Sequence, residues 1–272
     1  MTLDRNIAPP IKDAIDFDIQ LKPYQKYKLD NGVEVYAFEG GAQDVMLMEM
    51  VFFAGNSFET KNWVAPATNY LLKNGTSTKT AFEVNDAFEF YGAYLNRSCY
   101  NETATISLHT LTKHFQEVIP VVSELVSDAI FPENELEIYQ KNQIQQLTLN
   151  LKKGDFIANR FIDEYLFGIE HPYGKYSTEE SYNQLTKQDV VAFYNKYYKE
   201  GKCIVFMAGK FPANIESILN KYIGTLPLNN HEIVTPQHPI VAATQKKYSV
   251  VNDPSSVQGS IRIARHFPNR HH

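Results

Sequence analysis

The chain has 272 residues, of which 43% are hydrophobic and 21% charged, with 13 Gly and 13 Pro. This is the composition of an ordinary globular protein, long enough for one large or two small domains, and it excludes a disordered, collagenous or coiled-coil chain. The 26 basic and 31 acidic residues give a formal net charge of −5. No basic stripe stands out, so nucleic acid is not an expected partner.

Membrane insertion and export are not expected either. No segment approaches the roughly 18 apolar residues that a bilayer span requires. Residues 1–10 lack the apolar core of a secretory signal, so we expect a cytoplasmic protein, or a periplasmic one if a leader was removed. Cys99 and Cys203 form no C-x-x-C pair, and we expect both to be small buried hydrophobic residues.

The first half of the chain shows alternating strand and helix signals. Asn31-Gly32 predicts a hairpin between residues 27–29 and 33–38, because this dipeptide favours tight turns. Residues 45–53 are apolar nearly throughout, which predicts a strand covered on both faces. Helices are predicted over residues 64–73 and 81–91, each ended by a glycine, and strands over residues 94–99 and 103–110.

The second half is mostly helical. Apolar residues three and four apart predict an amphipathic helix over residues 115–126. Further helices are predicted over residues 133–152, from Asp155 to Phe167, over residues 186–199 and over residues 213–222, with a buried strand at 203–208. Thr186-x-x-Asp189 resembles a capping box for the helix that follows it.

These elements predict an α+β fold with a mostly antiparallel mixed sheet and helices on one face. We expect a domain over residues 1–225 and a linker over residues 226–245, which is rich in Pro, Asn and Thr. Residues 246–272 are interpreted as the first strands, at 248–251 and 258–265, of a truncated second domain.

Six segments occur in an order and at a spacing that match a known family pattern. They are residues 29–35 (LDNGVEV), 53–59 (FAGNSFE), 74–76 (NGT), 171–174 (HPYG), 197–209 and 256–263. Together they resemble the N-terminal half of a subunit of the pitrilysin/insulinase family of inverzincin zinc peptidases. The resemblance implies a fold like that of the mitochondrial processing peptidase.

The metal motif of this family is degenerate here. Active members carry H-x-x-E-H on the first helix, where two histidines bind zinc and the glutamate activates water. With Gly75-Thr76 as the anchor, the two histidine positions fall on Pro66 and Tyr70, and the glutamate position falls on Asn69. Proline has no donor atom, tyrosine is a rare ligand, and a neutral amide is no general base.

The later helix of the family, with E-x6-E, has lost its acids too. The third zinc ligand falls near Gln146 or Leu147, and its partner acid falls near Tyr139 or Gln140. We therefore expect no zinc, no other cofactor and no catalytic residue at this site.

Histidines elsewhere do not suggest a replacement metal site. His109 and His114 are five residues apart across a strand end and a helix start, which is poor geometry for chelation. His171 precedes a proline in a loop, where a hydrogen bond to local backbone is expected. His266, His271 and His272 lie at the end of the chain.

A strand used by active relatives to bind extended peptides corresponds to residues 92–98, with Leu95, Asn96 and Arg97 at its centre. Arg97 stands where the family usually has alanine. Two interpretations stay open: a peptide-binding edge, or an ordinary edge strand protected by a charge.

The main functional hypothesis is a non-catalytic subunit that helps a zinc-bearing subunit of the same family to enclose peptides. An active zinc endopeptidase with unconventional ligands is one alternative. A structural or assembly subunit that binds no peptide, like the core subunits of respiratory complexes, is another.

Overall fold

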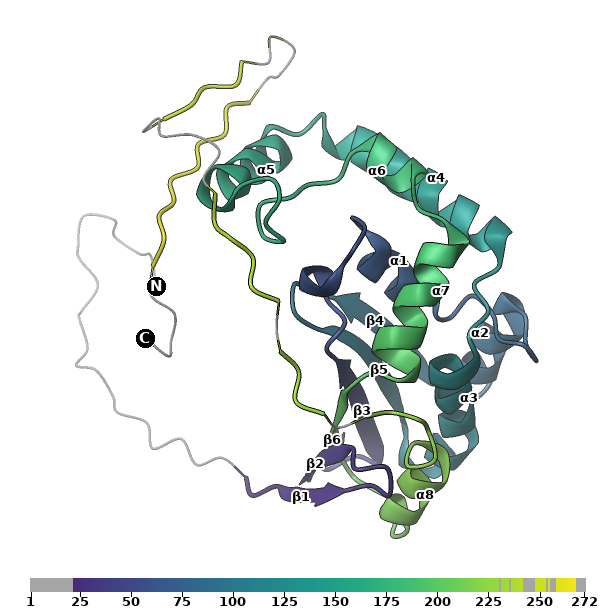
Figure 1. Cartoon of the computed structure of the whole chain (residues 1–272). Coiled ribbons are helices and arrows are strands. Elements are labelled where there is room, and N and C mark those ends of the chain that lie inside the picture. Colours follow the sequence, from purple (N-terminus) through teal and green to yellow (C-terminus); the bar gives the residue numbers. More distant parts are fainter. Residues whose placement is uncertain are drawn as a thin grey trace, which may run out of the picture.

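A six-stranded sheet forms the centre of the computed structural model, which describes residues 22–229, 231–234, 236–241, 248–252, 254 and 258–267 (Figure 1). The strands are β1 (Gln25–Lys28), β2 (Glu34–Glu39), β3 (Val45–Phe52), β4 (Tyr94–Cys99), β5 (Ala104–Leu111) and β6 (Cys203–Gly209). Their order is β1-β2-β6-β3-β5-β4, and only the β2–β6 pair is parallel. The mostly antiparallel mixed sheet predicted from the sequence is confirmed.

Most of the helices pack on one side of this sheet, whereas the helix Gly154–Phe167, which has no buried residue, lies apart from it (Figure 1). The helices are α1 (Val64–Leu71), α2 (Ala81–Glu89), α3 (Phe115–Asp128), α4 (Glu133–Asn150), α5 (Gly154–Phe167), α6 (Glu179–Asn183), α7 (Lys187–Tyr194) and α8 (Ile215–Tyr222). A π-helical turn, Asn195–Lys199, extends α7, and short 3-10 turns lie at Asn56–Phe58 and Thr112–His114. The sequence missed α6, whose five residues are too few to show a period.

The central strand β3 shows how the core is organised. Met46, Met48, Met50 and Phe52 are buried on the helix-covered face, whereas Leu47 and its neighbours on the other face are half-buried. The prediction that this strand is covered on both faces was therefore wrong. A run of apolar residues does not distinguish a doubly covered strand from one whose second face is only partly shielded.

The end of the chain has little regular structure. In the described parts of the predicted strands 248–251 and 258–265, no residue belongs to a strand. A β-strand needs a neighbour to accept its backbone hydrogen bonds, and no such neighbour pairs with the described residues there. The domain division stays a prediction, and the interpretations of residues 1–10, His271 and His272 lie outside the described residues. Among the described helices, none combines the length and hydropathy needed to cross a bilayer.

Candidate functional site

Helix α1 carries three of the positions singled out from the sequence, and it packs against β4, α4 and α7. The residue at the N-cap of this helix is Trp63. Its backbone is left-handed, with φ 70°, and its side chain makes no capping hydrogen bond. The carboxylate of Glu59 takes over this role by accepting a hydrogen bond from the backbone N–H of Ala65 (2.9 Å). An acid at this position also interacts favourably with the helix dipole. Pro66 lies in the first turn, where its missing N–H costs little.

Asn69 is a buried residue that links α1 to other elements by hydrogen bonds. Its side chain is buried, and its Nδ2 donates to the backbone oxygen of Thr105 on β5 (3.2 Å) and to the hydroxyl of Tyr198 (3.1 Å). Burial holds the pKa of Tyr198 well above its usual value, so its phenol stays protonated. Both groups would be left unsatisfied if Asn69 turned toward a ligand, which would be costly in the core. The amide is therefore committed to linking α1 with β5 and the turn after α7.

Tyr70 faces helix α4. Its side chain is 42% exposed, and its ring lies 5.0 Å from that of Tyr139, measured between centroids. Tyr139 lies 6.5 Å from Tyr182 of α6, and Tyr182 lies 6.1 Å from Trp63. These four rings, which we call the aromatic cluster, join α1 to α4 and α6. Burial raises the pKa of Tyr139 far above its usual value, so its phenolate is not available as a metal ligand.

Gln146 lies elsewhere on α4. It is exposed, and its Nε2 donates to Oδ1 of Asn150 one turn further along the same helix (3.3 Å). The residue of α4 that reaches α1 is Tyr139, one of the two candidates for the partner-acid position. The other candidate, Gln140, donates to the backbone oxygens of Tyr182 (2.8 Å) and Leu185 (3.0 Å). Leu147, the other candidate for the third-ligand position, is buried, so only Tyr139 and Gln140 of these four residues have the ring contact or side-chain hydrogen bonds to other elements described above.

The donor set does not fit zinc. Pro66 offers no donor, Asn69 makes two hydrogen bonds, and the ring of Tyr70 contacts that of Tyr139 in a tilted arrangement. In the described part of the chain, no three His, Cys, Asp or Glu side chains lie where they could hold a metal ion together. His171 Nδ1 instead accepts from the backbone N–H of Tyr173 (3.1 Å), the local bond that we expected.

A buried ion pair lies beside α1 that the sequence analysis missed. The side chains of Glu59 and Lys175 are only 2% and 7% exposed, and they are bonded to each other. Lys175 also lies over the ring of Trp63, 5.7 Å from its centroid. Burial raises the pKa of Glu59, although Lys175 and the N–H of Ala65 act in the opposite direction. The family-like segment 53–59 pointed to Glu59, but nothing in the sequence identifies a partner 116 residues away.

Strand β4 is an edge of the sheet. The backbone N–H of Tyr100 donates to the backbone oxygen of Thr103, and hydrogen-bonded and non-hydrogen-bonded residue pairs alternate along an antiparallel ladder. In this register Asn96 is hydrogen-bonded to β5, whereas the backbone N–H and C=O groups of Leu95 and Arg97 point away from the sheet. Within the described residues, no other backbone segment pairs with these outward groups. The edge that the sequence analysis singled out is therefore free to accept a further strand.

Arg97 turns its side chain toward α1. Its Nη1 donates to the backbone oxygen of Tyr70, and its guanidinium lies over the Tyr70 ring, 5.3 Å from the centroid. Its Nε is buried and has no hydrogen-bond partner in the described structure. A positive charge thus lies beside Tyr70, the residue at which the sequence analysis expects the second histidine position of the family motif.

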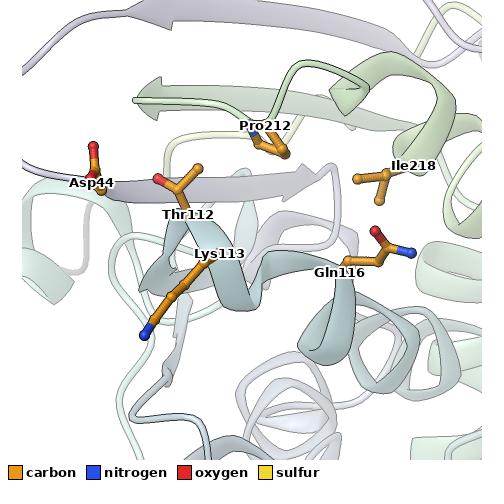
Figure 2. A pocket seen from close by; sticks show the side chains of 6 residues that line it. All are labelled: Asp44, Thr112, Lys113, Gln116, Pro212 and Ile218. Atoms are coloured by element: carbon orange, nitrogen blue, oxygen red, sulfur yellow. The ribbon is translucent and has the colours of Figure 1, made fainter.

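A cavity lies between the end of β5 and the N-terminal turns of α3 and α8, and none of the residues discussed above lines it. It has a volume of 260 Å³ and is lined by Asp44, Thr112, Lys113, Gln116, Pro212 and Ile218. Figure 2 shows that Lys113 extends away from Gln116 and Ile218, so the polar groups do not converge on one point. We find no chemistry that this cavity could perform.

The comparisons with known proteins agree with the motifs. A family model described as the peptidase M16 inactive domain matches residues 184–272. The chain is 20% identical over 187 residues to an uncharacterized zinc protease of Rickettsia felis, a match that covers 67% of this chain and 45% of that protein. It is 20% identical over 188 residues to cytochrome b-c1 complex subunit 1 of Mus musculus, covering 66% and 38%.

A solved structure shows the same fold. The crystal structure of a peptidase M16 inactive domain from Pseudomonas fluorescens has a TM-score of 0.71 and 22% identity, covering 80% of this chain and 54% of that chain. The matches confirm the resemblance to the M16, or pitrilysin, family and its inactive type. The chain spans about half the length, or less, of these relatives.

Proposed function

We propose that this M16-type domain is a non-catalytic partner, which pairs with a zinc-bearing subunit of the same family and helps to enclose the peptides that the subunit cuts. One observation carries the proposal. Helix α1 packs against α4, and the motif alignment puts Pro66, Asn69 and Tyr70 at the positions where the family pattern has two histidines and a glutamate. Neither zinc nor another cofactor is part of the proposed role.

Peptide binding would use the free edge of β4. An extended peptide can add to such an edge through backbone hydrogen bonds, which are independent of peptide sequence. The outward backbone groups of Leu95 and Arg97 would supply the donors and acceptors, while buried Leu95 fixes the strand on the core. Asn96, exposed on the open face of the sheet, would be available for side-chain contacts.

The experiment is to co-express the full protein with a candidate zinc-bearing homologue. We expect a stable complex in size-exclusion chromatography and peptidase activity higher than that of the homologue alone. A homologue with its zinc-binding histidines replaced by alanine should still form the complex but lose the activity. Absence of a complex at micromolar concentrations, together with unchanged activity, would contradict the proposal.

The similarity to a cytochrome b-c1 complex subunit favours a second candidate, a structural subunit of a larger assembly. In that case affinity-purified protein would bring down several different chains rather than one peptidase homologue. The edge of β4 would then bind no extended peptide, which the titration described below measures directly.

A further inference from the structure

Two cations lie together at the C-terminal end of α1 without a carboxylate partner. Lys73 follows the helix, and Arg97 on β4 bonds to the backbone oxygen of Tyr70. Among the described residues, neither makes an ion pair within 4.0 Å. Lys73 lies over the ring of Phe88 (5.7 Å to its centroid), as Arg97 lies over that of Tyr70.

This arrangement differs from that of Lys175, a cation of the described residues that is almost fully buried. Lys175 is neutralised by Glu59, a carboxylate equally removed from water. For Lys73, burial and then the charge of Arg97 lower the pKa, and Glu89 counteracts them only as the smallest contribution. The Lys73–Arg97 pair therefore places two positive charges in a partly desolvated region with no ion-pair partner among the described residues, where a bound anion would be favourable.

The guanidinium has unused hydrogen-bonding capacity. Of its five N–H donors, only the one on Nη1 has an acceptor in the described structure, the oxygen of Tyr70. The buried Nε has none. Arginine binds carboxylates through two parallel N–H donors, a geometry that lysine cannot reproduce.

The position of the pair relates it to the edge of β4. The backbone groups of Arg97 face outward from the sheet, while its side chain lies against α1. A strand added along this edge would therefore pass next to the guanidinium. Figure 1 shows α1 and β4 side by side.

We propose that Lys73 and Arg97 form an anion-binding subsite that selects extended peptides carrying a carboxylate, from an Asp or Glu side chain or from the peptide C-terminus. The inference rests on the proposed docking of peptides along β4. The arginine then provides a permanent positive charge in the place of the lost metal, so the site binds an acidic group and does not activate water.

The test uses two fluorescein-labelled peptides, identical chains of Ser, Thr and Val with one central Glu or Gln, titrated with the full protein by fluorescence anisotropy. A third peptide, the Gln version with a free instead of an amidated C-terminus, distinguishes the two sources of carboxylate. We expect wild-type protein to bind the Glu peptide, or the free C-terminus, about tenfold more tightly than the neutral amide.

Arg97→Gln should abolish this preference, so that its affinities for the Glu and Gln peptides become equal. Lys73→Gln should reduce the preference, and it serves as the second variant if Arg97→Gln lowers the melting temperature. Lys221→Gln on distant α8 removes the same charge and should leave the preference unchanged.

Equal affinities of wild-type protein for all three peptides would overturn the subsite while leaving peptide docking and subunit pairing intact. Absence of binding of every peptide at millimolar protein would overturn both the subsite and the docking. Subunit pairing is measured separately by co-expression, so its failure remains distinguishable.

Discussion

The ring of Tyr70 lies 5.0 Å from the ring of Tyr139, and this contact joins α1 to α4, the two helices on which the family motif would place zinc ligands. A tilted ring contact of this kind stabilises the α1–α4 interface without a metal. Buried Tyr139 and half-exposed Tyr70 occupy the space between the two helices, so introducing zinc ligands requires more than changing residue identities.

We expect the variant Pro66→His, Asn69→Glu, Tyr70→His to bind zinc poorly. The guanidinium of Arg97 lies against residue 70 and repels a divalent cation at short range. Adding Arg97→Ala should therefore increase zinc affinity by about tenfold or more, measured by isothermal titration calorimetry. Equal zinc affinities of the two variants, both folded by circular dichroism, would show that Arg97 does not control the site.

Replacing Asn69 should reveal its structural role. Asn69→Leu keeps the approximate size of the side chain but leaves the Thr105 oxygen and the Tyr198 hydroxyl without their donor. We expect a loss of about 2 kcal/mol in the free energy of unfolding, measured with urea. Asn134→Leu, at an exposed site on α4, should change it by less than about 0.5 kcal/mol. A similar small effect for Asn69→Leu would contradict the role assigned to it.

The ion pair between Glu59 and Lys175 should show strong coupling. Lys175→Met leaves the carboxylate of Glu59 buried without a partner, for which we expect a loss of about 3–5 kcal/mol in the free energy of unfolding. The double variant Glu59→Gln, Lys175→Met should recover much of this loss, because no unpaired charge remains. If the double variant were as unstable as the sum of the single variants, the two residues would not interact.

The pH dependence of stability should carry the signature of Glu59. Its pKa in the folded protein is raised above 4.5 by burial, so below the folded pKa the folded chain holds a proton that the unfolded chain releases. Its contribution to stability is therefore fully present below about pH 4.5 and is lost as the pH rises through the folded pKa. Wild-type protein should gain stability relative to Glu59→Gln on acidification, measured by urea midpoints from pH 8 to 4. A relative loss would show that the pKa is lowered instead.

The parts of the fold that the sequence predicted correctly are those that depend on local patterns. The capping box at Thr186 and Asp189 is present, with the side chain of Thr186 accepting from the N–H of Asp189. The apolar spacing over residues 115–126 matches α3, whose buried residues repeat at the expected interval. Both signals operate within one or two helical turns, so they need no information on tertiary structure.

The site required information that is not local. The positions of Pro66, Asn69 and Tyr70 on one helix followed from a motif, but the contact of Tyr70 with Tyr139 depends on how α1 and α4 pack. The inward turn of Arg97 likewise depends on the free carbonyl of Tyr70 at the end of α1. Such contacts between distant segments are fixed by packing, which sequence periodicity does not encode.

The two cysteines should distinguish a closed edge of β4 from an open one. Burial raises the pKa of the Cys99 thiol to about 12 and also raises that of Cys203, so neither is a thiolate near neutral pH. Because only the thiolate is nucleophilic, we expect native protein at pH 8 to react slowly with Ellman's reagent, whereas urea-unfolded protein should release both thiols at once. Cys99 ends β4, so rapid reaction of one thiol in native protein would mean that this edge opens in solution. Cys99→Ser should remove that fast phase, and its persistence would assign the opening to β6 instead.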